Sequence, residues 1–275
     1  MKKMSSKILV LLVLVVTSCN SYNKLLRSTD YAYKYEAAKE FFTCGQYIKS
    51  AQLLEELIMI LKGSDKEQES LFMLAMCYYN VNDYETSCLY LERYYKSYPK
   101  GEYAELSRFY AGKASYLQSP DPRLDQTPTM TAINQLQEFL DLYPYSSRRD
   151  EANDMIFQLQ DRLVQKEYNS AKLYYNLGSY TGNCTNGGSN YEACIITAEN
   201  ALRAYPYTNL REDLYMMILR AKYQLASRSI DAKLEERFRE TIDEYYGFQN
   251  EFPDSKYIKE ANKIFEDSNK HINKN

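Results

Sequence analysis

The stretch from Arg148 to Tyr180 reads RRDEANDMIFQLQDRLVQKEYNSAKLYYNLGSY and contains no Pro, and no Gly before Gly178. Apolar residues recur in it at steps of three and four, which indicates one face of a helix. They are Ala152, Met155, Ile156, Leu159, Leu163, Val164, Tyr168, Ala171 and Tyr175. Ser147 followed by Asp150 predicts the start of this helix, and Gly178 predicts its end. Such a helix would be roughly 50 Å long, so we expect it to pack on two different neighbours and to join two halves of the chain.

A tandem repeat is marked by an aromatic residue followed by Pro. The pair occurs at Tyr98-Pro99, Tyr143-Pro144, Tyr205-Pro206 and Phe252-Pro253. Fifteen residues before each Pro stand Tyr84, Thr129, Tyr191 and Phe238, and twelve before stand the small residues Ser87, Ala132, Cys194 and Thr241. A fifth copy, with Tyr47 and Ser50, ends at Lys62-Gly63. An aromatic turn residue, a small residue at a close helix approach and a Pro that ends the helix are typical of the second half of a tetratricopeptide repeat.

A first helix is predicted before each copy, and the copies are separated by insertions. The expected first helices are Tyr31–Thr43, Lys66–Asn80, Glu102–Leu117, Arg148–Gly178 and Asn209–Ser227. Ser119–Pro128 and the Gly-rich Thr181–Asn190 are expected to be loops. Ser255–His271 suits a capping helix with a polar outer face. The sequence therefore predicts an all-α fold, a right-handed superhelix of about five tetratricopeptide-like hairpins plus a C-terminal capping helix.

The N-terminus has the features of an export signal. Lys2, Lys3 and Lys7 precede the apolar run Ile8–Val16, as in a secretory signal peptide. Val16-Thr17-Ser18-Cys19 resembles the bacterial lipobox, whose cleavage leaves an acylated N-terminal Cys that anchors the chain in a membrane. We expect residues 1–18 to be a lipoprotein signal peptide, Cys19 to be the lipid attachment site, and residues 19–30 to be a polar tether. An ordinary signal peptide with a chance Cys is the alternative.

Two further segments follow the tether, residues 31–145 with repeats 1–3 and residues 146–275 with repeats 4–5 and the capping helix. The formal charge of −3 becomes −6 when the three lysines of the signal are removed, so no nucleic-acid partner is expected.

Catalytic chemistry is poorly represented. His271 is the only histidine, so neither a Ser/His or Cys/His pair nor a His-based metal site is expected. Glu55-Glu56 and Glu235-Glu236 suit solvated helix faces, and Gly187-Gly188 lacks the residues of a phosphate loop. We expect no catalytic residues, no metal, no cofactor and no enzymatic activity.

Cysteines and tyrosines are interpreted first as packing residues. Cys44, Cys77, Cys88 and Cys194 fall on or beside repeat positions and are expected to be small buried side chains, and a Cys184–Cys194 disulfide stays open as an alternative for the insertion loop. Eight tyrosines at helical spacing are expected mostly to fill the interior, with the remainder lining a peptide-binding groove. They are Tyr78, Tyr79, Tyr90, Tyr94, Tyr95, Tyr98, Tyr174 and Tyr175.

An ordered run of motifs resembles one family. Asp161-Arg162-Leu163, then Glu167-Tyr168, Ala171, Tyr174 and Gly178, then Leu202, Tyr205-Pro206 and Thr208 are similar to the pattern of the BamD family of outer-membrane assembly lipoproteins. The resemblance implies a periplasm-facing, lipid-anchored scaffold of the outer membrane. Its C-terminal repeats would dock on a barrel insertase with periplasmic repeat domains, and its N-terminal repeats would receive unfolded β-barrel substrates. The insertion Thr181–Asn190 departs from the family pattern beside the expected docking half.

Five residues are predicted to bind the partner, because Arg and Tyr dominate interface energetics. They are Arg162, Glu167, Tyr174, Arg203 and Arg211. The alternative for each is an intramolecular contact. A tetratricopeptide lipoprotein that serves as an adaptor for cell-wall enzymes is the alternative function, whereas a glycan-binding lipoprotein is disfavoured by the absence of Trp.

Overall fold

The computed structural model describes residues 22–180 and 189–272, and every regular element within these ranges is an α-helix. Internal contacts divide the chain into two compact units. The N-terminal unit extends to Gln118 and includes Asn134–Ala152, and the C-terminal unit comprises Ser119–Ile133 and Asn153–Asn275. The predicted division into residues 31–145 and 146–275 separates repeats rather than compact units, so it stays a prediction. The signal peptide and Cys19 lie outside the described residues.

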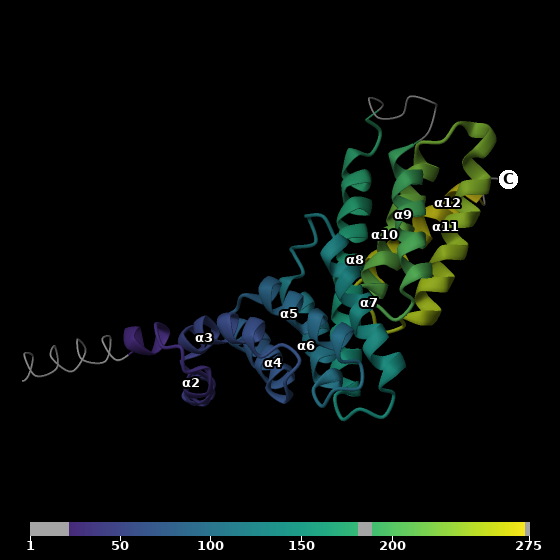
Figure 1. The fold of residues 1–275 in the computed structure, drawn as a ribbon. Coiled ribbons are helices and arrows are strands. Elements are labelled where there is room, and N and C mark those ends of the chain that lie inside the picture. The colour runs from purple at the N-terminus through teal and green to yellow at the C-terminus, as the bar shows by residue number, and fades with distance from the viewer. Residues whose placement is uncertain (1–21, 181–188, 273–275) are drawn as a thin grey trace, which may run out of the picture. The chain divides into compact units, whose positions relative to one another are not determined.

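Consecutive helices pair as hairpins (Figure 1), which confirms the predicted all-α chain of tetratricopeptide-like repeats. The first hairpins are α2 (Tyr31–Thr43) with α3 (Tyr47–Ile60) and α4 (Asp65–Asn80) with α5 (Tyr84–Ser97). Next come α6 (Ala104–Gln118) with α7 (Thr127–Leu142) and α8 (Arg149–Leu177) with α9 (Asn190–Ala204). The last are α10 (Arg211–Ser227) and α11 (Asp231–Glu251), followed by α12 (Ile258–Ile272). The predicted first helices agree with these bounds to within about two residues, as expected for helix ends.

The small residue of each repeat lies where two helices meet. All five small positions have 0 % exposure: Ser50, Ser87, Ala132, Cys194 and Thr241. In two copies the hydroxyl also bonds to the first helix. Ser50 Oγ donates to the Ala38 carbonyl at 2.8 Å, and Ser87 Oγ donates to the Ala75 carbonyl at 2.9 Å. A larger side chain would push the paired helices apart, so the spacing of small residues sets the hairpin packing.

The second helices end where the aromatic–Pro pairs predict. α5, α7, α9 and α11 end directly before Tyr98, Tyr143, Tyr205 and Phe252, respectively. Pro has no N–H and restricts the residue before it, so the helix cannot continue. After α3, Gly63 has φ +81°, which serves the same purpose without Pro.

Helix α8 is continuous from Arg149 to Leu177, as the apolar pattern predicts. Gly178 follows it with φ +54°, the left-handed conformation of a helix stop, and its N–H donates to the Tyr174 carbonyl. At the N-terminal end of α8, the side chain that bonds to the backbone is Ser146, not the predicted Ser147. Ser146 Oγ accepts from the Arg148 N–H at 3.1 Å and donates to Glu105 at 2.6 Å, so Ser146 positions this start.

The segment before α2 differs from a free polar tether. Residues 22–26 form a helical turn, and Leu25 is buried in the core of the first hairpin. The Tyr22 ring packs edge-on against Phe41 at 5.6 Å between centroids. Burial of these apolar side chains explains why the turn is held, since the repeat otherwise leaves that end of its core uncovered.

Helix α12 caps the last hairpin as predicted. Ala261 and Ile264 are buried against Tyr245 and Phe248 of α11. The single histidine, His271, lies at the end of this helix. Its ring stacks on Phe238 with centroids 4.2 Å apart and planes 1° apart.

Candidate partner-binding surfaces

Asp161, from the motif that supports the family resemblance, holds the loop between α9 and α10. Its carboxylate accepts from the Thr208 hydroxyl at 2.6 Å, from the Asn209 N–H at 3.1 Å and from the Asn209 side-chain amide. Thr208 is buried, so this bond also satisfies a hydroxyl that water cannot reach freely. The two separated motifs therefore meet in space, and their contact shapes the loop that carries Pro206 and Tyr207.

Arg162 and Arg211 are intramolecular braces. Arg162 Nη1 donates to the Ser119 carbonyl at 2.6 Å, which ties α8 to the loop before α7. Arg211 donates to the Pro206 carbonyl at 2.9 Å, pairs with Glu251 and lies over the ring of Tyr215. Both side chains are half-buried and committed to the fold, as the intramolecular alternative predicted.

The other three predicted residues differ in accessibility. Arg203 is exposed on α9. Glu167 is half-buried beside Tyr205, and the pKa of the Tyr205 hydroxyl is raised by burial and by the Glu167 charge. Tyr174 packs against the core of the C-terminal unit. The five residues thus do not form one exposed patch, and Arg203 is the exposed one among them.

A small aromatic pocket lies beside the Asp161 contact. It measures about 180 Å³ and is lined by α8, the end of α9 and the α9–α10 loop, with Phe157, Tyr205, Pro206 and Tyr207 supplying most of its apolar wall. Tyr207 is 86 % exposed. Exposed tyrosines beside a preformed pocket are typical of binding hot spots. Sequence reasoning missed Phe157 and Tyr207, although an aromatic residue directly after Tyr205-Pro206 was a signal that could have indicated them.

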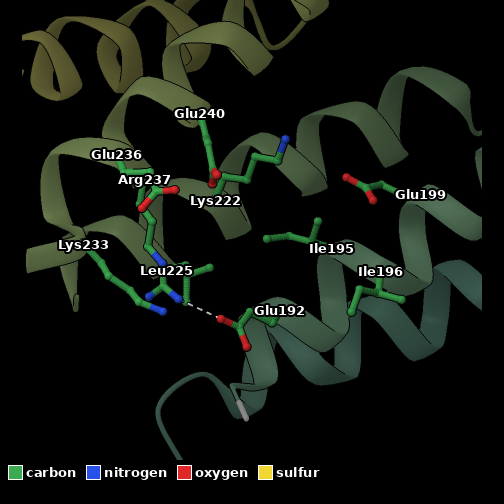
Figure 2. A pocket seen from close by; sticks show the side chains of 10 residues that line it. All are labelled: Glu192, Ile195, Ile196, Glu199, Lys222, Leu225, Lys233, Glu236, Arg237 and Glu240. Carbon is green, nitrogen blue, oxygen red and sulfur yellow. Dashed lines mark hydrogen bonds and ion pairs between the residues drawn. The ribbon is translucent and has the colours of Figure 1, made fainter. Parts of the chain in front are cut away.

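A larger groove of about 570 Å³ lies between α9, α10 and α11 (Figure 2). Ile195, Ile196 and Leu225 supply its apolar surface. Figure 2 shows Arg237 reaching Glu192, with which it forms an ion pair. The Arg237–Glu192 distance is 2.8 Å, and Lys222 pairs with Glu244, which is not drawn in the figure, at 2.7 Å. Within the described ranges no ion pair is recorded for the remaining carboxylates of the groove, Glu199, Glu236 and Glu240. These three carboxylates outweigh Lys233, which also lines the groove, so the groove suits an apolar segment with a positive charge.

The N-terminal unit presents a stacked aromatic pair among charged residues. Phe72 of α4 and Tyr103 stack with centroids 4.5 Å apart and planes 4° apart, and both are half-buried. Lys39 of α2 pairs with Glu69 of α4 at 2.9 Å near this stack. Lys66 lies over the ring of Tyr35, which is itself buried. This face offers aromatic edges and long cationic side chains together, which suits an extended peptide.

The eight tyrosines expected to divide between core and groove are all at least half-buried. Tyr94 and Tyr95 are buried, and the pKa of Tyr95 is raised to about 12 by burial and by the charge of Glu92. Tyr78 and Tyr90 stack on each other at 5.7 Å. Packing therefore accounts for the majority of this set.

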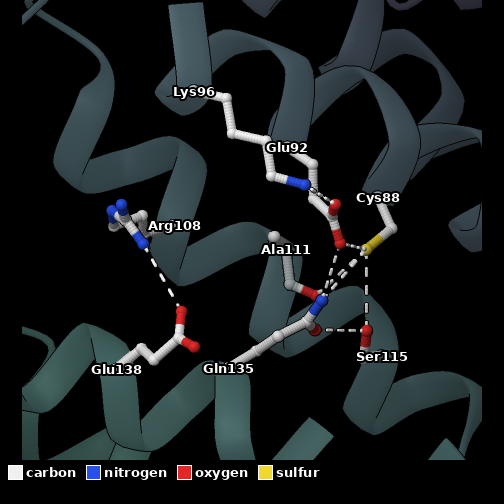
Figure 3. A network of polar contacts seen from close by, with 8 residues as sticks. All are labelled: Cys88, Glu92, Lys96, Arg108, Ala111, Ser115, Gln135 and Glu138. Atoms are coloured by element: carbon white, nitrogen blue, oxygen red, sulfur yellow. Dashed lines mark hydrogen bonds and ion pairs between the residues drawn. The ribbon is translucent and has the colours of Figure 1, made fainter. Parts of the chain in front are cut away.

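A half-buried cysteine and a half-buried carboxylate share one polar network in the N-terminal unit (Figure 3). Cys88 contacts Glu92 and Ser115, and Gln135 donates to Glu92 at 3.0 Å and accepts from Ser115 at 2.6 Å. The pKa of the Cys88 thiol is raised, chiefly by burial, so the thiolate needed for nucleophilic chemistry is disfavoured. The network is better explained as a polar link between α5, α6 and α7.

The predicted burial of the cysteines is confirmed at Cys77 and Cys194, whereas Cys88 is only half-buried. Cys77 and Cys194 are buried free thiols, whose pKa values burial raises to about 11 and about 12. Cys44 is exposed, so the expectation of burial is wrong there; it follows α2 in a turn rather than facing the partner helix. Cys184 lies outside the described residues. In residues 22–180 and 189–272, no three His, Cys, Asp or Glu side chains are placed to hold a metal ion.

Comparisons with known proteins bear on this arrangement. The model of the YfiO family, described as "Outer membrane lipoprotein", matches residues 28–186, more than half of the chain. No curated protein matches. Two crystal structures of a Podosopora anserina putative kinesin light chain with nearly identical TPR-like repeats, one of them a single-residue variant, are each 13 % identical with a TM-score of 0.33. They cover 82 % of this chain and 96 % or 97 % of their own, a likeness too slight to add to the fold described above. Because the family model spans the motif-bearing helix α8 and most of the preceding hairpins, the chain belongs to the YfiO family of outer membrane lipoproteins, which is the BamD family.

Proposed function

We propose that the chain is a non-enzymatic scaffold lipoprotein of the outer-membrane β-barrel assembly machinery. The match of the YfiO family over residues 28–186 is the observation that carries this proposal. The contact of Asp161 with Thr208 and Asn209 supports it, because it gives the family motifs a shared structural purpose. In this proposal the protein binds and orients other proteins and performs no chemistry itself.

The chain is anchored through Cys19, acylated after removal of residues 1–18, and faces the periplasm. A lipid is the anchor that the lipobox implies. Among the described helices, none combines the length and the apolar character needed to cross a bilayer. Several acyl chains on one cysteine hold a protein at a membrane where a single chain would not.

The C-terminal unit docks on the barrel insertase through the loop that Asp161 positions. Arg203 and Tyr207 make direct contacts, and the pocket lined by Phe157 and Tyr205 receives an apolar side chain of the insertase. Arg162 and Arg211 act indirectly, because their guanidinium groups hold the neighbouring loops. Substitution of Arg203 or Tyr207 is therefore expected to weaken insertase binding directly, whereas substitution of Arg162 or Arg211 acts through the loops that they hold.

The N-terminal unit receives unfolded barrel segments on the face that carries Phe72 and Tyr103. A barrel strand alternates apolar and polar side chains, so one edge can meet the aromatic stack while the other meets Lys39 and Lys66. The affinity of each such contact is modest, which suits a scaffold that must release its substrate.

Co-purification tests the proposal. The full chain with a C-terminal tag is recovered from membranes in mild detergent, and its partners are identified by mass spectrometry. We expect a β-barrel insertase with periplasmic repeat domains, and we expect Tyr207→Ala and Arg203→Glu to reduce its yield about tenfold or more, as hot-spot losses do. Lys172→Glu, an exposed charge reversal on α8, is the matched control. Recovery of cell-wall hydrolases without an insertase would contradict the proposal and favour the adaptor function.

A further inference from the structure

The chain enters the first hairpin at one defined end. The Tyr22 hydroxyl donates to Gln52 Oε1 at 2.6 Å and lies 3.1 Å from the Lys49 carbonyl oxygen, and its ring contacts Phe41. Phe41 is near the end of α2 and Lys49 is near the start of α3. Tyr22 therefore lies beside the turn that joins α2 to α3, here called the α2–α3 turn (residues 44–46).

A buried lysine clamps the entering segment. Lys34 is 1 % exposed, and its ammonium donates to the Leu26 carbonyl at 2.9 Å and pairs with Glu56 at 2.6 Å. A buried ammonium is stable only when its hydrogen bonds are satisfied. Lys34 thereby connects three pieces: the entering segment, α2 and α3. Leu25, buried between them, adds apolar contact.

The distance from this clamp to the membrane is short. Cys19 precedes Tyr22 by three residues, which span at most about 11 Å when fully extended. We infer that the lipid-anchored protein rests the α2–α3 turn on the surface of the bilayer. This inference rests on the anchor at Cys19 that is part of the proposed function.

The side chains at this end suit a lipid surface. Ile48, on the first turn of α3, is 66 % exposed and can enter the headgroup layer. Lys24 and Arg27 are exposed on the entering segment and can meet lipid phosphates. A long flexible linker would let the first hairpin take any orientation at the membrane. A linker of three residues before a fixed Tyr22 keeps the α2–α3 turn close to the bilayer surface.

Fluorescence quenching in vesicles tests the inference. The full acylated chain carrying Cys184→Ser is labelled at the exposed Cys44 with an environment-sensitive dye and reconstituted in vesicles whose headgroups carry a quencher. The comparison protein also carries Cys44→Ser and Lys62→Cys, which moves the dye past the far end of α3, about 20 Å away. We expect quenching at Cys44 to be at least about threefold greater, because contact quenching fades over a shorter distance than the length of α3.

Two variants separate the clamp from the anchor. Lys34→Met and, independently, Tyr22→Phe release the entering segment, so quenching at Cys44 should fall toward the level at Lys62→Cys while the protein still floats with vesicles. A variant is interpreted when its helical circular dichroism spectrum is unchanged, because the first hairpin is then still folded. Equal quenching at the two positions in protein that floats overturns the membrane contact alone. Failure to float overturns both this inference and the lipid anchor of the proposed function.

Discussion

Replacing Asp161 by Ala should destabilise the C-terminal unit and weaken insertase binding together. Asp161 is half-buried on α8, and its carboxylate accepts three hydrogen bonds from Thr208 and Asn209. Asp161 also lines the pocket proposed to receive an insertase side chain, so the loss of stability, and not the loss of binding alone, identifies its structural role. Its removal therefore tests whether the family motif is a brace for the loop that carries Tyr207.

The size of the effect follows from these bonds. A hydrogen bond to a charged group contributes about 1.5–3 kcal/mol, and a buried group left without a partner costs about 1–3 kcal/mol. Asn209 is exposed and regains water, whereas Thr208 is buried. We therefore expect Asp161→Ala to lower the free energy of unfolding by about 2–3 kcal/mol, or roughly 5–10 °C in Tm for a chain of this size. Asp161→Asn keeps one acceptor oxygen and should lose about half as much.

Thermal and urea unfolding followed by circular dichroism measure this loss. Asp154→Ala is the matched control, because Asp154 lies exposed on the same helix, and its effect should stay within about 0.5 kcal/mol. The insertase yield in co-purification should fall with Asp161→Ala and stay unchanged with Asp154→Ala. Equal stability of the two Ala variants would refute the brace.

Three further predictions concern acid stability, packing and helix termination. Hydrogen bonds from Arg220, at 2.7 and 2.6 Å, lower the pKa of Glu260 below its ordinary value of 4.5, so the unfolded chain binds more protons at this carboxyl than the folded chain does. The stabilisation is therefore present at neutral pH and is lost as the pH falls through about 4.5 toward the lower pKa of the folded state. Glu260→Gln should flatten this part of a plot of Tm against pH. Ser87→Leu should lower the free energy of unfolding in urea by about 1–3 kcal/mol, because the larger side chain overpacks the site beside Ala75. Glu85→Leu, at an exposed position of the same helix, should leave it unchanged, and a tolerated Ser87→Leu would contradict the repeat register. Gly178→Ala should lower Tm by an amount equivalent to about 1–2 kcal/mol, because φ is +54° and a Cβ would lie 2.7 Å from the Tyr191 hydroxyl, whereas Ser179→Ala should leave Tm unchanged.

Local patterns account for what could be predicted from the sequence. Each hairpin depends on residues close together in the chain: a helical apolar period, a small residue at the helix contact and a Pro or Gly stop. Ser50, Ser87 and Thr241 are all fully buried because that spacing leaves room for nothing larger. The repeat register, the long helix α8 and the family motifs could therefore be recognised without coordinates.

Other features depend on residues far apart in the chain, and only the tertiary structure decided them. Arg162 and Arg203 look equally suited to a partner in the sequence, yet one is bonded to Ser119 and the other is exposed. Asp161 meets Thr208, which lies 47 residues away, because α9 returns beside α8. Lys34 is buried because Leu26 and Glu56 supply its hydrogen bonds, a pairing that no local pattern encodes. Local periodicity selects the helices, whereas the side chains that brace loops or meet partners are selected by long-range packing.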